Sequence, residues 1–155
     1  MFLDATLPPV SLLAVPDLAR AAETVGFDAL WSTETQHDPF LPLALAAEHT
    51  QRLHLGTAIA VAFARSPAVL AYTAWDLAEA SHGRFLLGLG TQVRAHIERR
   101  FGMPWPDSPT GKLRAALYPG TPTSIVDPKE SEPRGVGYEQ LEEEVERCAA
   151  ELFGW

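Results

Sequence analysis

A glutamate and a histidine lie three positions apart, directly after a segment with the pattern of a β-strand. The strand is expected over residues 27–32, and Glu34 and His37 follow it. A histidine titrates near neutrality, so His37 could move a proton to or from a substrate hydroxyl or a reduced cofactor. It could also be a structural residue at the start of a helix, with its ring bonded to a backbone carbonyl. Glu34 could bond a cofactor, hold His37 in one tautomer, or be a solvated loop carboxylate.

Small and polar residues also follow two further predicted strands. Residues 58–64 form the end of the third strand, and Arg65 comes next. A guanidinium can bind a phosphate or a carboxylate bidentately, although a surface arginine before a helix is the commoner case. Thr91 and Gln92 follow the fourth strand and its turn, Gly88-Leu89-Gly90. That turn lacks the third glycine of a dinucleotide fingerprint, so it indicates a tight turn at a strand end.

These segments belong to a regular alternation of strand and helix. Apolar runs indicate strands over residues 2–7, 27–32, 53–63 and 85–89, and helical spacing indicates helices over about 16–25, 38–50, 66–80 and 94–101. A βαβαβαβα order implies parallel strands joined by right-handed crossovers. A doubly wound open sheet and a (β/α)8 barrel both have this order. In a barrel, the residues that follow the strands would converge on one rim, where reacting groups lie.

The rest of the chain has a different character. Prolines at 104, 106, 109, 119, 122, 128 and 133 interrupt any regular element, so we expect a boundary near Trp105 and an irregular segment over residues 106–136. An acidic amphipathic helix is expected over residues 137–155. Its apolar face contains Leu141, Val145, Cys148, Ala149 and Leu152.

Composition limits the classes of protein to which the chain can belong. It has 155 residues, of which 46% are hydrophobic and 21% charged, so it can bury a core. The formal net charge is −8, from 12 basic and 20 acidic residues, which argues against binding to nucleic acids or anionic membranes. The single cysteine excludes a disulfide framework and a cysteine-based zinc site, and we expect no metal. Without a membrane-spanning run or a signal peptide, we expect a cytoplasmic protein.

Several segments together resemble the luciferase-like monooxygenase superfamily, and within it the oxidoreductases that depend on coenzyme F420. They are AAETVGFDALW (residues 21–31), ETQHDPF (34–40), LGTAI (55–59) followed by ARSP (64–67), and GRFLLGLGT (83–91). The resemblance covers residues 1 to about 105 and implies a (β/α)8 barrel. It also implies a flavin or deazaflavin across the carboxyl ends of the strands, and hydride or oxygen chemistry on a small-molecule substrate. Coenzyme F420 is the expected cofactor, and flavin mononucleotide (FMN) is the alternative.

The resemblance also assigns roles to residues at the rim. His37 would be a catalytic base or a cofactor contact. The cofactor would be held by Glu34, Ala58, Ile59, Gly88, Gly90 and Thr91, with a non-prolyl cis peptide at Ala58–Ile59 behind its ring and glycines that let the backbone approach the ring. The substrate would be bound by Gln36, Phe40, Arg65 and Gln92. Without the resemblance, Ala58 and Ile59 would be residues of a buried strand and Phe40 a core residue.

The chain departs from the family in sequence and in length. The sugar-phosphate dehydrogenases of the family carry an acidic residue before the histidine and a glutamate after the glycine turn, where this chain has Gln36 and Val93. The acid partner of that mechanism is therefore missing. A whole barrel needs about 250 residues, so we expect only the first four βα units here.

Two interpretations other than an oxidoreductase stay open. A truncated half-barrel would be non-catalytic and would act through association, because open sheet edges invite pairing with another chain. Its partner would be a second copy in a homodimer or a complementing barrel half. The acidic C-terminal helix could instead make the chain a protein-interaction module.

Overall fold

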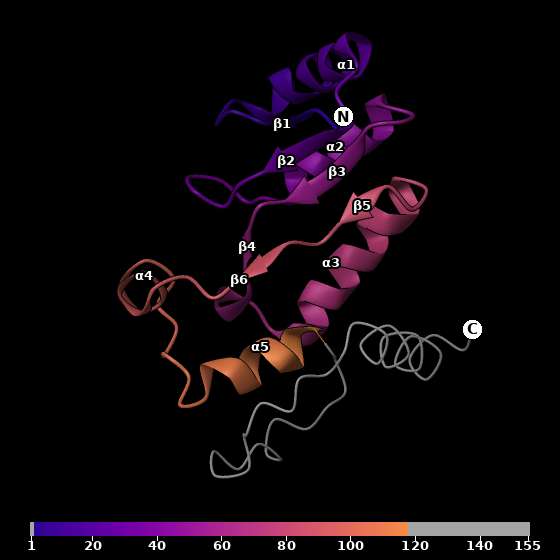
Figure 1. The fold of residues 1–155 in the computed structure, drawn as a ribbon. Helices are drawn as coiled ribbons and strands as arrows, with labels where there is room; N and C mark the ends of the chain where they lie inside the picture. Colours follow the sequence, from indigo (N-terminus) through magenta and orange to yellow (C-terminus); the bar gives the residue numbers. More distant parts are fainter. Residues whose placement is uncertain (1, 118–155) are drawn as a thin grey trace, which may run out of the picture.

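Strands and helices alternate along residues 2–117, the part of the chain that the computed structural model describes (Figure 1). The strands are β1 (Asp4–Thr6), β2 (Ala29–Ser32), β3 (His54–Thr57), β4 (Ala60–Val61), β5 (Phe85–Leu86) and β6 (Leu89–Gly90). The helices are α1 (Val15–Val25), α2 (Leu41–His49), α3 (Pro67–Ala80), α4 (Arg94–Arg99) and α5 (Pro109–Leu117), with short 3-10 helices η1 (Leu12–Ala14) and η2 (Ala62–Ala64). Of these described helices, none is long and apolar enough to cross a membrane.

A parallel sheet of four strands, in the order β1-β2-β3-β5, forms the centre of the fold. Leu30 and Leu55 lie opposite each other in adjacent strands, and both are almost completely buried. They belong to a core shared with Leu43 of α2 and Leu70 of α3. Helix α1 packs beside α2, and α2 beside α3. The predicted parallel α/β order, with a helix after each strand, is confirmed.

Helix ends follow the signals in the sequence. The Ser66 hydroxyl accepts the backbone N–H of Val69 (3.2 Å), and Pro67 occupies the first turn of α3, as predicted. Helix α1 ends at Gly26, whose φ of 98° lies in the left-handed region that favours glycine. These caps mark the start of α3 and the end of α1.

A buried arginine joins the end of α2 to the start of β5. Arg84 is 9% exposed. It donates hydrogen bonds to the carbonyl groups of Ala47, Thr50, Leu53 and Ser81 and to the Thr50 hydroxyl. The guanidinium thereby satisfies carbonyl groups that the end of a helix leaves without partners.

The third and fourth strands are each broken, so the expectation of continuous strands over residues 53–63 and 85–89 is wrong. The pieces β4 and β6 pair with each other in a separate parallel ladder. The chain therefore changes pairing partners between β3 and β4, and the hydrogen bonds on either side of the change belong to different ladders. Ala58 N–H donates to the Ser32 carbonyl (2.8 Å), and Ala60 N–H donates to the Gly88 carbonyl (2.8 Å).

A further helix lies inside the segment that we expected to be irregular. Helix α5 begins after Ser108, whose hydroxyl accepts the backbone N–H of Gly111 (3.2 Å), and it packs against α3 and η2. Pro109 occupies its first position, where a proline starts a helix instead of breaking one. The rest of the expected irregular segment and the helix expected over residues 137–155 lie outside the described residues.

Candidate functional site

Three loops meet at the carboxyl ends of the strands, where the sequence predicts the site. Glu34 N–H, in the loop after β2, donates to the Ile59 carbonyl (3.3 Å) between β3 and β4. The same segment reaches Gly88, between β5 and β6, through Ala60. Backbone hydrogen bonds thus bring residues that are about 25 to 55 positions apart into one cluster.

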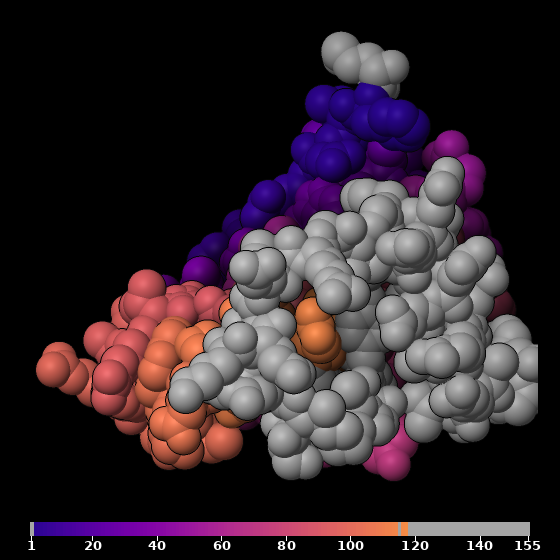
Figure 2. Space-filling model, turned by 60° about the horizontal axis from the view of Figure 1, so that its bottom comes forward, coloured from indigo at the N-terminus to yellow at the C-terminus, as the bar shows by residue number. Residues whose placement is uncertain are grey.

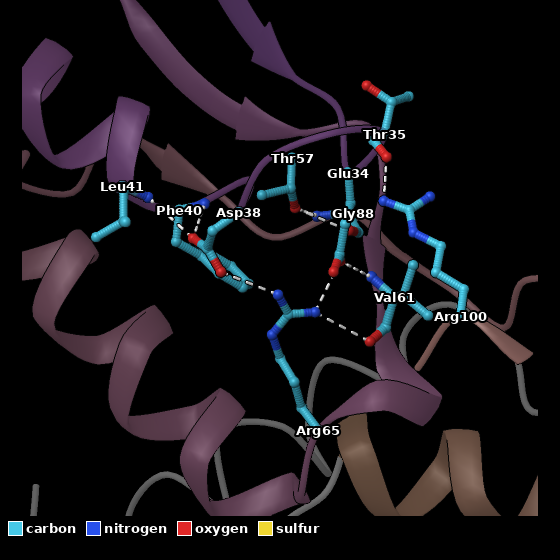
Figure 3. A network of polar contacts seen from close by, with 10 residues as sticks. All are labelled: Glu34, Thr35, Asp38, Phe40, Leu41, Thr57, Val61, Arg65, Gly88 and Arg100. Atoms are coloured by element: carbon cyan, nitrogen blue, oxygen red, sulfur yellow. Dashed lines mark hydrogen bonds and ion pairs between the residues drawn. The ribbon is translucent and has the colours of Figure 1, made fainter. Parts of the chain in front are cut away.

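A buried ion pair braces this cluster (Figure 3). The Glu34 side chain is 5% exposed, and its Oε2 accepts the Val61 N–H (2.6 Å) and Nη1 of Arg65 (2.7 Å). Arg65 also donates through Nη2 to Asp38 (3.0 Å), and its guanidinium lies over the Phe40 ring, 5.1 Å from the centroid. Burial alone would lower the pKa of Arg65. The carboxylates of Glu34 and Asp38 raise it by more, so the pKa of Arg65 lies above its ordinary value.

This arrangement gives the surroundings of three predicted residues. Arg65 is half-buried and paired, so its positive charge is already balanced. Phe40 is 5% exposed beneath it and belongs to the hydrophobic core, and its contact with a substrate stays a prediction. Among the described residues, no hydrogen bond joins Glu34 to His37, so Glu34 does not set the tautomer of that ring. Glu34 holds β4 and Arg65 in place.

The predicted cofactor residues Ala58, Ile59, Gly88 and Gly90 lie together. The Ala58–Ile59 peptide bond is cis, as the resemblance implies. A methyl group on Gly88 would lie 2.0 Å from the Thr57 carbonyl oxygen, and one on Gly90 would lie 2.7 Å from Cδ1 of Ile59. The two glycines are therefore needed where the third and fourth strands approach each other. That these glycines also let the backbone approach a ring stays a prediction.

His37 lies in an exposed position beside a hollow between the loops after β1 and β2. The hollow has an empty volume of about 380 Å³, including space open to solvent. Its polar wall contains Ser32, Thr33, Thr35, His37 and Asp38, and its apolar wall contains Leu7, Pro8, Pro9, Val10, Leu12, Val15 and Pro42. Within residues 2–117, no hydrogen bond occupies the His37 ring, in contrast to the structural alternative of a ring bonded to a carbonyl. The ring is thus accessible to a ligand.

The remaining predicted residues surround this cluster. Gln36 is exposed in the same loop as His37, and Thr91 and Gln92 are half-buried after β6. Gln92 has a φ of 59°, a left-handed conformation that is rare outside glycine. Its Oε1 accepts the Val93 N–H (3.3 Å) and lies 3.2 Å from Nδ1 of His96.

Sequence reasoning missed Arg100, which also reaches the rim. Figure 3 shows its guanidinium directed at the loop after β2, where Nη2 donates to the Thr35 carbonyl. Thr35 lines the hollow beside His37. Arg100 directly follows α4, and no motif in the sequence singles it out.

Comparisons with known proteins agree with the fold. A model of the luciferase-like monooxygenase family matches residues 4–113. The uncharacterized protein Rv1360 of Mycobacterium tuberculosis is 59% identical over 103 residues, which are 66% of this chain and 30% of that protein. This chain therefore spans about a third of the length of the curated relatives that it matches.

Two solved structures are similar in fold. One is the oxygenating constituent of 3,6-diketocamphane monooxygenase from Pseudomonas putida, in complex with FMN, with a TM-score of 0.66 and 20% identity over 76% of this chain and 38% of that one. The other is the coenzyme F420-dependent tetrahydromethanopterin reductase from Methanopyrus kandleri, with a TM-score of 0.63 and 24% identity over 74% and 38%. These neighbours are TIM-barrel enzymes, so the described residues have the fold of the N-terminal part of such a barrel.

Proposed function

Because the chain belongs to the luciferase-like monooxygenase family, we propose that it provides the N-terminal half of the cofactor site of an F420-dependent oxidoreductase. In such an enzyme, hydride moves between the cofactor and a small organic substrate. An FMN-dependent monooxygenase is the alternative, since one structural neighbour is named for coenzyme F420 and another was solved with FMN. Both cofactors present a similar tricyclic ring.

One observation carries the proposal: Ala58, Ile59, Gly88 and Gly90 form a strip of small residues at the rim. Ala58 is exposed, and the other three are half-buried. A planar ring fits against such a strip, because the only large side chain on it is that of Ile59. Thr91 continues the strip beyond Gly90. The cofactor, when bound, supplies the acceptor or donor of hydride.

The chain's own residues then act around the ring. Glu34 holds the Val61 N–H and Arg65, so the strip keeps its position when a ligand arrives. His37 takes or gives a proton at an imidazole nitrogen, from its exposed place beside the hollow. We assign the hollow beside His37, with one polar and one apolar wall, to the substrate. Gln36, in the same loop as His37, and Gln92, after β6, are assigned as substrate contacts.

Titration of the full 155-residue chain with F420 and with FMN, followed by cofactor fluorescence, tests the proposal. We expect saturable binding of at least one cofactor. Ala58→Trp, which fills the strip, should weaken that binding by about tenfold or more. Ala68→Trp, at an exposed position of α3, is the matched control and should leave binding unchanged. Absence of binding by either cofactor, or equal binding by both variants, would contradict the proposal.

A non-catalytic half-barrel that acts through association is the second candidate. Strands β1 and β5 lie at the edges of the four-stranded sheet, and no further strand pairs with either edge within residues 2–117. Open edges favour addition of strands from another chain. This candidate predicts association without cofactor binding. The titration with F420 and FMN therefore distinguishes it from the oxidoreductase.

A further inference from the structure

A buried threonine lies where the two halves of the strip meet. Thr57, the last residue of β3, is 1% exposed. Its hydroxyl donates to the Gly88 carbonyl (2.8 Å) and accepts the Gly88 N–H (2.9 Å), as Figure 3 shows. A hydroxyl can do both, because it has one O–H and two acceptor lone pairs. One side chain thus bonds both backbone groups of Gly88.

The strand ladders leave a gap at this point. The last pair of the β3–β5 ladder is Gly56 with Leu86, and the first pair of the β4–β6 ladder is Ala60 with Leu89. Three residues (57–59) separate these pairs on one strand, but only two (87–88) on the other. A strand with one residue more than its neighbour has the count of a β-bulge, a feature that often lies next to active sites. The Thr57 hydroxyl joins the two strands inside this gap.

Thr57 acts on the strip from behind. Ala58 is exposed and Ile59, Gly88 and Gly90 are half-buried, whereas Thr57 is fully buried. The chain that continues from β6 into α4 lies at the surface, in coral beside the orange segment of α5 (Figure 2). A ligand on the strip would therefore touch Ala58 or Gly88 and not the Thr57 hydroxyl.

The two halves of the strip are held by different side chains. Glu34 holds the half that contains Ala58 and Ile59, because its carboxylate accepts the Val61 N–H. Thr57 joins the half that contains Gly88 to the end of β3. The contact is close, since a methyl group on Gly88 would lie 2.0 Å from the Thr57 carbonyl oxygen. A shift at Thr57 is thus passed directly to Gly88.

We propose that Thr57 is a positioning residue, whose hydroxyl sets the spacing between the two halves of the strip. The value of this spacing for a cofactor ring rests on the proposed function; the spacing itself does not. Valine has nearly the shape of threonine but lacks the hydroxyl. With valine, the Gly88 N–H would lose this partner, and the Gly88 carbonyl would keep the Ala60 N–H.

Hydrogen exchange of the isotopically labelled full chain, followed by NMR, tests the spacing without a ligand. Relative to the α1 amides, the Gly88 amide should exchange about tenfold faster or more in Thr57→Val. In Thr57→Ser, which keeps the hydroxyl, it should stay within about threefold of wild type. Thr50→Val removes an equally buried hydroxyl at the end of α2 and should leave this ratio unchanged.

The wild type provides a test that does not depend on the folding of any variant. The Thr57 hydroxyl proton should exchange slowly enough to give an NMR signal with a contact to the Gly88 amide proton. Thermal unfolding shows which variants are folded at the temperature of the measurements. A missing hydroxyl signal, or an unchanged Gly88 amide in folded Thr57→Val, would overturn the role of the hydroxyl.

Titration of the same variants with F420 and with FMN tests the effect on binding. Thr57→Val should weaken affinity by about fivefold or more, because a strip that must be ordered on binding binds less tightly. Thr57→Ser and Thr50→Val should stay within about twofold of wild type.

Two outcomes of the titration would contradict the role of Thr57 in binding and leave the proposed function standing. One is wild-type affinity in Thr57→Val, and the other is an equal loss in Thr57→Val and in either Thr57→Ser or Thr50→Val. Absence of cofactor binding by the wild type would contradict the proposed function, while the exchange of the Gly88 amide would still decide the spacing.

Discussion

Glu34 is the residue on which the geometry of the rim depends most. Its carboxylate is buried and bonds both a backbone N–H of β4 and the guanidinium of Arg65. Loss of Glu34 would leave the half-buried guanidinium with the more exposed Asp38 as its remaining ion-pair partner among the described residues, which costs more than loss of a surface pair. Both contacts are made by Oε2 of this carboxylate.

Replacement of this carboxylate should therefore destabilise the protein. We expect Glu34→Gln to lower the free energy of unfolding by about 1–3 kcal/mol, because Arg65 loses its closest counter-charge. Glu98→Gln makes the same change in the exposed pair with Arg94 and should cost less than about 0.5 kcal/mol. Urea denaturation measures both. Equal effects of the two variants would show that Glu34 does not brace the rim.

Glu23 gives the stability a dependence on pH. Burial raises its pKa, but hydrogen bonds from the N–H groups of Arg52, Leu53 and Gln51 lower it more, so it lies below its ordinary value of 4.5. A lowered pKa in the folded state stabilises the protein above pH 4.5, and this stabilisation is lost as the pH falls through the folded-state pKa.

Unfolding of wild type and Glu23→Gln at several pH values tests this contribution. The difference in unfolding free energy should be largest at neutral pH and should shrink as the solution becomes acidic. Glu48→Gln, at an exposed position of α2, is the control and should show no such trend. A difference that grows toward acid would contradict the lowered pKa.

The sequence predicts which residues follow the strand ends and gather at one rim, but not the contacts between them. His37, Ala58 and Gly88 were found because strand ends meet at one rim and because the resemblance marks them. The pairing of Glu34 with Arg65 and the reach of Arg100 to Thr35 join positions 31 and 65 residues apart. Such contacts follow from the loop conformations, which hydrophobic periodicity does not encode.

At the scale of elements, local signals predicted helices better than strands. Ser66-Pro67 and Gly26 mark helix ends through their own backbone chemistry, and both marks are correct. The third and fourth strands change pairing partners part-way along. An apolar run does not show such a change, so it predicts one long strand. The sequence analysis does not predict helix α5, because it treats Pro109 as a residue that breaks helices. Pro109 instead occupies the first turn of α5, where proline is tolerated.

The two glycines at the breaks should respond differently to substitution. Gly88→Ala places a methyl group against the backbone carbonyl of Thr57, which cannot move without breaking the sheet, and should cost more than about 2 kcal/mol. Gly90→Ala meets the end of the Ile59 side chain, which can rotate, and should cost about 1 kcal/mol. Thermal unfolding measures the loss of stability in each variant. A larger loss in Gly90→Ala than in Gly88→Ala would contradict the packing of the two strands.

At the scale of the whole molecule, the described sheet is open. Strands β1 and β5 form its edges, and Leu86 of β5 is 44% exposed. Apolar side chains and unpaired backbone groups at one edge favour contact with another chain. The fold therefore agrees with the part of a barrel that the similar structures share.

We predict that the folded chain associates, either as a homodimer or with a complementing barrel half. Association covers the open edges and the apolar side chains beside them. Sedimentation velocity of the purified 155-residue chain should reveal a dimer or a larger species. A well-folded, monodisperse monomer would be the opposite result and would show that the edges need no partner.

The central claim is that the strip between the broken strands holds the cofactor ring. Hydrogen–deuterium exchange of the full chain, with and without F420 or FMN, tests it most directly. We predict that cofactor slows exchange over residues 57–61 and 87–92, while the α1 amides stay unchanged. Bound cofactor with no protection in those two segments would contradict the account.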